Sequence, residues 1–211
     1  MAVALVAAAV VLVLLLVRPW ELESLPGGIE VDPARVAELE AAEVERNDEN
    51  LTAAAELAVS AQERLLPVMD GLHEALPTDE ARPERPTSAE LGEWRDVVQE
   101  VAGEVEALPP GSSEHNIVRN GLLLSTALLG DTLDVLELAG ETGGAGDAGA
   151  SEGAERLYGV AGDLRSRAVD AWAQAAVQLD LQYIGADRGH LHAFLPLHSG
   201  MSTEAEPHTN H

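Results

Sequence analysis

Apolar residues recur every three or four positions in four segments between residues 33 and 186, and stretches rich in proline or glycine separate these segments. This spacing is typical of amphipathic helices. The first segment begins at Asp32-Pro33, residue types that favour an N-cap and a first helical position. It continues to about Leu76, and Pro67 is expected to kink or divide it. Apolar residues spaced seven apart predict its seam: Val44, Leu51, Ala58, Leu65 and Leu72.

Three further helices are predicted from capping signals and apolar stripes. Thr87 and Glu90 form a capping-box pattern at the second helix, and Ser112 or Ser113 is expected to cap the third. A glycine-rich break over residues 139–153 precedes the fourth, which begins near Ser151. The predicted buried stripes are Leu91, Trp94, Val98, Val101, Val105 and Leu108 in the second helix; Ile117, Leu124, Leu128, Val135 and Leu138 in the third; and Leu157, Ala161, Leu164, Ala168, Trp172, Ala175 and Leu179 in the fourth. In the third helix Leu122, Leu123 and Leu129 widen the stripe, and this helix is expected to be the most buried.

These patterns predict an all-α protein whose residues 33–186 form an antiparallel four-helix bundle. Aromatic residues make up only 3% of the chain, which favours closely packed Leu, Val and Ala over a sheet. An N-terminal signal-anchor or transmembrane helix (1–20) and a linker (21–32) are expected before the bundle. A His-rich, largely mobile tail is expected over residues 187–211. Asn47, Asn120 and Asp131 are predicted as buried polar residues that fix helix register.

The leader contains sixteen consecutive apolar residues, 2–17. As a helix this run would rise about 24 Å, short of the roughly 30 Å hydrocarbon core, so its length falls between a signal peptide and a spanning helix. No small-residue cleavage site follows it, which favours an uncleaved anchor. We therefore expect a single-pass cell-membrane protein with its acidic domain outside the cytoplasm. Cleavage between about Arg18 and Gly28, or packing as a core helix, are the alternatives.

The formal net charge is −25, from 37 acidic and 12 basic side chains, and every basic one is arginine. Such a charge repels nucleic acid and anionic lipid headgroups, and it suits a solvated surface, a cationic protein partner or a high-salt setting. The chain lacks cysteine, which excludes disulfides and thiolate metal sites. Gly144, Gly146 and Gly149 match G-x-G-x-x-G, but no strand precedes them, so no nucleotide site is expected. No catalytic motif is present, and we do not expect an enzyme.

Five of the seven histidines lie in the last 22 residues. In an extended segment His190 and His192 point to one face, and His198 could return as a third ligand for Zn, Cu or Ni. Asp187 could orient one of these imidazoles. A polar tail that merely contains histidine is the alternative. The sequence thus favours a membrane-tethered, extracytoplasmic bundle with a structural or interaction role, and a metal-binding protein as the second hypothesis.

Overall fold

The computed structural model describes residues 32–78, 83–144 and 148–197. Throughout these residues the only regular elements are helices: α2 (Pro33–Ala75), α3 (Ser88–Ala107), α4 (Ser113–Gly143) and α5 (Ala148–Gly185). The protein is therefore all-α, as the apolar spacing predicts. The chain forms two compact units, residues 1–41 and 42–211, and the boundary falls within α2.

Only residues 32–41 of the first unit are described, and they comprise the start of α2. Asp32 caps this helix, since its carboxylate accepts a hydrogen bond from the Ala34 backbone N–H at 3.0 Å. Side chains here are exposed, including Leu39 at 56%. The predicted anchor (1–20) and linker (21–31) lie outside the described residues. Among the helices that are described, none combines the length and apolar character needed to cross a bilayer.

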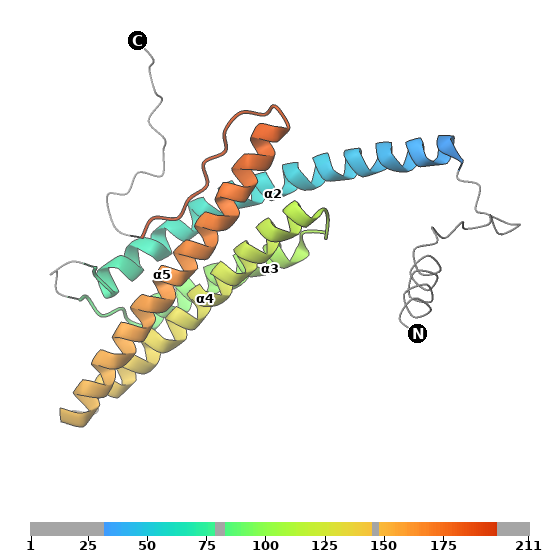
Figure 1. Cartoon of the computed structure of the whole chain (residues 1–211). Coiled ribbons are helices and arrows are strands. Elements are labelled where there is room, and N and C mark those ends of the chain that lie inside the picture. Colours follow the sequence, from blue (N-terminus) through green and yellow to red (C-terminus); the bar gives the residue numbers. More distant parts are fainter. Residues whose placement is uncertain (1–31, 79–82, 145–147, 198–211) are drawn as a thin grey trace, which may run out of the picture. The chain divides into compact units, whose positions relative to one another are not determined.

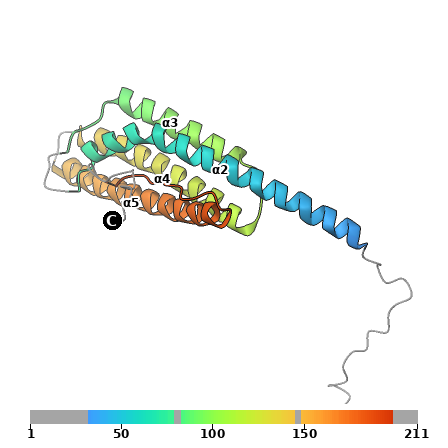
Figure 2. The ribbon, with the colours of Figure 1, turned by 90° about the horizontal axis from the view of Figure 1, so that it is seen from above.

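The second unit is a helical bundle in which successive helices run in opposite directions, and Figure 1 and Figure 2 show α2 to α5 side by side. Helices α4 and α5 pack closely at Gly121, where an added Cβ would lie 2.9 Å from the Ala175 Cβ. The capping box at the start of α3 is present, with Thr87 and Glu90 in the predicted roles. Ser112 caps α4 by accepting a hydrogen bond from the His115 N–H at 3.1 Å.

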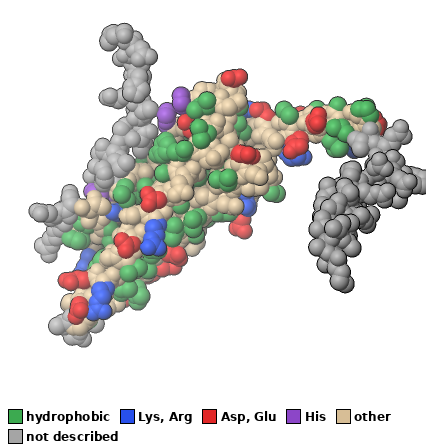
Figure 3. Space-filling model, in the orientation of Figure 1, with side chains coloured by type: hydrophobic (Ala, Val, Ile, Leu, Met, Phe, Trp, Pro, Cys, Tyr) green, Lys and Arg blue, Asp and Glu red, His purple; other side chains and the backbone are tan. Residues whose placement is uncertain are grey.

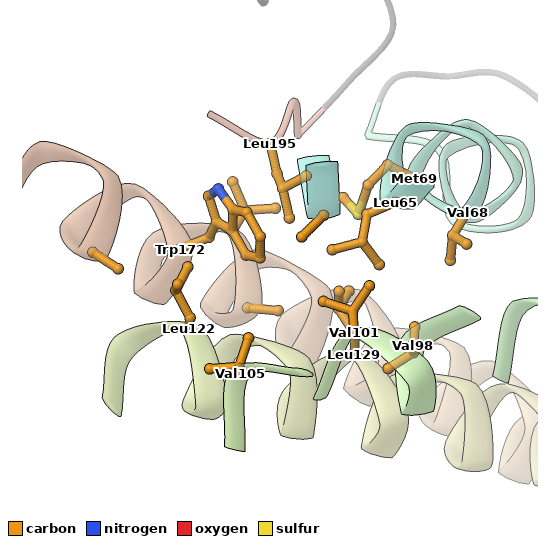
Figure 4. Close-up of a cluster of buried hydrophobic side chains, with 14 of the residues drawn as sticks. Leu65, Val68, Met69, Val98, Val101, Val105, Leu122, Leu129, Trp172 and Leu195 are labelled. Atoms are coloured by element: carbon orange, nitrogen blue, oxygen red, sulfur yellow. The ribbon is translucent and has the colours of Figure 1, made fainter. Parts of the chain in front are cut away.

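In the described part of the chain the core consists mainly of alanine, leucine and valine, and Trp172 is its one fully buried tryptophan. Figure 4 shows this cluster, in which Leu65 of α2 and Val101 of α3 point toward one another and Leu122 of α4 lies near Trp172. Burial of this apolar surface drives the helices together. The seam predicted for α2 is confirmed from Leu51 onward. The predicted face of α3 is also buried, apart from the partly exposed Trp94.

Val44 does not belong to the seam, since it is 69% exposed. The buried face of α2 begins at Asn50, where the connection between α3 and α4 approaches it; a Cβ on Gly111 would lie 2.7 Å from Asn50 Nδ2. Residues before Asn50 therefore lack neighbours on that side. Pro67 does not divide α2, which remains one helix from Pro33 to Ala75.

The predicted stripe of α4 is wrong in its register. Ile117, Leu124 and Leu138 are about half exposed (56%, 54% and 49%). The buried face is centred on Val118, Leu122, Ser125, Leu129, Thr132, Leu133 and Leu136. Of the predicted residues, Leu122 and Leu129, which were expected to widen the stripe, are the ones that are fully buried. This helix has apolar residues on two adjacent faces, and the small residues Gly121 and Ser125, which allow α5 to approach, decide which face is buried.

The predicted buried polar residues are also wrong. Asn120 and Asp131 are exposed, and Asn47 is only half-buried. Hydroxyl groups occupy the core instead, because each finds a nearby backbone carbonyl. Ser125 Oγ donates to the Ala168 carbonyl of α5 at 2.8 Å, and Thr132 Oγ1 donates to the Leu128 carbonyl of its own helix at 2.7 Å. Both therefore satisfy the hydrogen-bonding requirement of a buried polar atom.

Candidate functional site

The C-terminal segment, residues 188–197, packs against the bundle beside α2 and α5 (Figure 1). Gln62 Nε2 of α2 donates to the Phe194 carbonyl at 2.7 Å, and Arg188 Nη1 donates to Thr52 Oγ1 at 2.7 Å. On the other side, Trp172 Nε1 of α5 donates to the Ala193 carbonyl. The segment therefore runs parallel to α2 and antiparallel to α5, joined by hydrogen bonds to both.

The packing of residues 188–197 was not expected from a tail predicted to be largely mobile over residues 187–211, of which residues 198–211 lie outside the described part of the chain. Ala193 and Leu195 are 1% and 3% exposed, and Leu191 and Leu197 are half-buried on the same side. His190 and His192 are exposed on the other side. Alternation with period two is the signal of an extended, half-buried segment. In this chain the alternation covers only a few residues, so it is hard to distinguish from the neighbouring helical patterns in the sequence.

Asp180 of α5 fastens the start of the segment. Its Oδ1 accepts the Leu191 backbone N–H at 2.7 Å, and its Oδ2 lies 3.3 Å from His190 Nδ1. Burial of this carboxylate acts to raise its pKa. The Leu191 hydrogen bond and the adjacent imidazoles of His190 and His192 outweigh burial, so the pKa of Asp180 lies below its ordinary value. The arrangement favours an ionised Asp180 and holds the chain as it leaves α5.

The structure brings two of the three predicted metal ligands together. The rings of His190 and His192 are nearly parallel, with their centroids 5.8 Å apart and 10° between their planes. His198 lies outside the described residues. Asp187 is exposed with a φ of 57°, at the turn that ends α5. Within the described residues, no group of three or more His, Cys, Asp or Glu side chains is arranged to hold a metal ion. The structure therefore places two predicted ligands, His190 and His192, side by side, and the third ligand, His198, stays a prediction.

A second feature, which the sequence analysis missed, is the buried Arg165 of α5. Its side chain is 1% exposed, and its Nη1 donates to the Leu72 carbonyl of α2 at 2.8 Å. Among the described residues, the Arg165 Nε has no hydrogen-bond partner. No carboxylate of the described residues forms an ion pair with this guanidinium. Desolvation by burial lowers the pKa of Arg165.

A sequence signal for Arg165 does exist. The fully buried positions of α5 follow a strict alternation of four and three residues: Ala161, Arg165, Ala168, Trp172, Ala175 and Leu179. The predicted stripe has Leu164 in place of Arg165, because leucine is the ordinary core residue of the two. The structure leaves Leu164 half-buried and gives the seam position to the arginine.

An acidic stripe runs along α2, defined by Glu49, Glu56, Glu63 and Asp70. These residues lie seven apart and are all exposed, and none forms an ion pair with an arginine of the described residues. Their 21-residue span corresponds to about 32 Å of helix. Figure 3 shows acidic side chains distributed along the visible face of the molecule.

No protein-family model, curated protein or solved structure matches this chain. The residues and their geometry alone therefore carry the functional argument.

Proposed function

We propose that this protein is a membrane-tethered helical bundle that presents an acidic surface to a cationic partner outside the cytoplasm. One observation carries the proposal: a run of sixteen consecutive apolar residues and a folded bundle occur in the same chain, whose net charge is −25. The apolar run requires an environment other than water. The acidic bundle requires an aqueous one. A tether at a membrane surface satisfies both requirements.

Attachment through residues 2–17 follows from the apolar character of the run. The bundle core is filled by its own helices and by the C-terminal segment. An exposed apolar helix of this size would be an aggregation liability in water, whereas a bilayer accommodates it. The strongly negative bundle gains nothing from contact with anionic headgroups. Hydrophobic insertion of the leader is therefore the proposed mode of attachment.

The attachment is tested by fractionation of the full-length chain. We expect it to sediment with membranes and to resist extraction by high salt and alkaline carbonate. Deletion of residues 1–20 is expected to release a soluble protein, since the helices have charged outer faces. Mass spectrometry of the N-terminus provides the complementary measurement. A mature chain beginning between about Arg18 and Gly28 would show a secreted protein and remove the tether from the proposal. Intact protein in the soluble fraction would contradict both export and anchoring.

The side of the membrane is tested separately. Protease added to intact cells whose envelope is permeable to it is expected to degrade the bundle. Protection of the bundle until the membrane itself is disrupted would contradict the extracytoplasmic location.

Binding to a cationic partner is supported by the charge balance, because twelve arginines cannot neutralise 37 carboxylates. The acidic stripe of α2 offers a linear array that a helix with arginine at every seventh position would complement. Such complementarity accelerates association and selects partners, and it weakens as salt screens the charges. The proposed interaction is therefore electrostatic and localised on α2.

The probe for this interaction is a synthetic helical peptide with arginine at every seventh position. The variant Glu56→Gln/Glu63→Gln/Asp70→Asn is expected to weaken its binding to the full-length protein several-fold at low salt. The matched control, Glu155→Gln/Asp163→Asn/Asp170→Asn, removes three exposed carboxylates of α5 and the same net charge. Equal weakening by the two triple variants would show a response to net charge alone and contradict a stripe on α2.

Metal binding is the second candidate function, and the pairing of the His190 and His192 rings on one exposed side of the C-terminal segment favours it. Imidazole nitrogen binds Zn, Cu and Ni, and the adjacent Asp180 carboxylate supports the orientation of His190. His198 is the proposed third ligand.

Equilibrium dialysis of the full-length protein against Zn²⁺ and Cu²⁺ tests this function. We expect His190→Asn/His192→Asn to abolish high-affinity binding and His198→Asn to weaken it. The control His208→Asn/His211→Asn also removes two tail histidines and should retain binding. Equal metal content in the two double variants would contradict the assignment of His190 and His192 as metal ligands.

A further inference from the structure

Arg165 is a buried charge whose described surroundings do not balance it. A cation removed from water is costly unless it is paired or fully hydrogen-bonded. Arginine keeps its charge in proteins and has five N–H donors. The hydrogen bond from Nη1 to the Leu72 carbonyl satisfies one of these donors, and the buried Nε has no acceptor among the described residues. This guanidinium therefore lacks a counter-charge among the residues described.

A structural role accounts for only part of this arrangement. Leu72 lies in the last turn of α2, where backbone carbonyls lack intrahelical partners and the helix dipole is negative. The Leu72 carbonyl oxygen has two lone pairs and accepts hydrogen bonds from both Arg165 Nη1 and, at 2.9 Å, the Leu76 N–H. A helix-capping role thus explains the position of Nη1 but leaves the Nε edge of the guanidinium without a function.

Arg165 lines a cleft of about 400 Å³ at the end of the bundle where α2 terminates. The walls combine apolar surface from Leu76, Pro77 and Pro83 with the side chain of Tyr158. Small ligands bind in clefts that combine apolar walls with polar groups that set orientation. The polar groups that line this cleft beside Arg165 include Thr78, Asp163 and Ser166. A buried charge and a cleft at the same place are two independent observations, and together they indicate a ligand.

We propose that this cleft binds a small monocarboxylate with an apolar body, whose carboxylate accepts hydrogen bonds from the guanidinium of Arg165. The planar guanidinium matches a carboxylate in a two-point contact. The apolar walls and Tyr158 accommodate the rest of the ligand. Asp163 also lines the cleft, and the protein is strongly acidic, so a single negative charge is preferred over the double charge of a phosphate monoester.

Benzoate is the probe, benzamide is its uncharged counterpart, and inorganic phosphate represents the more highly charged class. Each is titrated into the full-length protein in a non-ionic detergent, with melting temperature and calorimetric heat as the readouts. We expect benzoate to raise the melting temperature with saturation near a Kd of about 1 mM, a value in the range open to so small a ligand. Benzamide and phosphate should have no saturable effect.

Arg165→Met removes the charge while retaining a long apolar side chain. It is expected to weaken benzoate binding at least tenfold and to raise the melting temperature of the unliganded protein, because no charge is then buried. Arg165→Lys keeps a charge but loses the planar fork, and the same weakening is expected. The control Arg167→Met removes an exposed arginine two residues away and should retain full binding.

A measurement on the unmutated protein avoids any dependence on the folding of the variants. The Nε–H resonances of the arginines are followed by NMR during the benzoate titration, and one of them is expected to shift and saturate with the calorimetric Kd. Three outcomes would overturn the proposal: no saturable benzoate binding at about 10 mM, benzoate binding unchanged in Arg165→Met and Arg165→Lys, or tighter binding of phosphate than of benzoate.

Discussion

Trp172 Nε1 donates a hydrogen bond to the carbonyl oxygen of Ala193, and this contact joins the middle of α5 to a segment that follows the last helix. The indole is fully buried, so its N–H would have no partner without the segment. The segment in turn places Leu195 in the core. The folded bundle therefore consists of four helices and an extended chain that completes their core.

The first prediction concerns the contribution of this segment to stability. Leu195→Ala is expected to lower the free energy of unfolding by about 2–4 kcal/mol, because the residue is buried and its loss leaves a cavity. Leu181→Ala is the matched control: the same change on a 57% exposed side chain of α5 should cost less than about 0.5 kcal/mol. Chemical denaturation of both variants measures the difference, and equal midpoints would show that the segment does not pack in solution.

The second prediction distinguishes the two apolar faces of α4. Leu122 is 1% exposed and Leu124 is 54% exposed. Leu122→Asp should prevent folding or lower stability by more than about 4 kcal/mol, since it buries an unpaired charge. Leu124→Asp should cost about 1 kcal/mol or less, mainly through helix propensity. Thermal melts of the two variants measure the difference. A greater loss of stability for Leu124→Asp than for Leu122→Asp would show that the buried face of α4 is the one predicted from the sequence.

The third prediction concerns a glycine at a helix contact. A Cβ on Gly71 of α2 would lie 2.1 Å from the nearest ring atom of Trp94 in α3, so an alanine there must displace the indole. Gly71→Ala is expected to destabilise the protein by about 1–3 kcal/mol despite the better helix propensity of alanine. Gly92→Ala, where nothing lies within 4 Å of the added Cβ, should stabilise it by up to about 1 kcal/mol. Stabilisation by both changes would mean that Trp94 does not cover Gly71.

The fourth prediction is a pH dependence at Asp180. Because the folded state lowers the pKa of this carboxylate, its ionised form contributes stability above the unfolded pKa of about 4, and this contribution is lost as the pH falls through the folded pKa. Asp180→Asn lacks the contribution at every pH. The melting-temperature difference between wild type and Asp180→Asn should therefore be largest near about pH 7 and shrink below about pH 4.

Asp170→Asn is the control for this pH series, since Asp170 is an exposed aspartate of the same helix. The melting-temperature difference between wild type and Asp170→Asn should be small at every pH of the series. A wild-type minus Asp180→Asn difference that stays constant from neutral to acidic pH would contradict the role of the Asp180 charge in fastening Leu191.

Helix positions were predictable because their determinants are local. Asp32, Thr87 and Ser112 cap the backbone of the residues that immediately follow them, and such contacts depend on a few neighbouring residues. The seam of α2 was predictable from Leu51 to Leu72, because a seven-residue apolar repeat defines one face of a helix without reference to other elements. The first residue of that seam depends on how far the neighbouring elements extend along α2. For this reason the sequence wrongly predicted that Val44 belongs to the seam.

By itself the sequence determined the helical class, the caps, the seam of α2 and the excess of negative charge. Tertiary structure alone decided which of two apolar faces of α4 is buried, since both have helical spacing and only the approach of α5 at Gly121 and Ser125 selects one. It also decided that an extended segment completes the core and that Arg165 occupies a seam position. Both depend on contacts between residues that are far apart in the chain, such as Gln62 with Phe194 and Arg165 with Leu72, and local patterns do not encode such contacts.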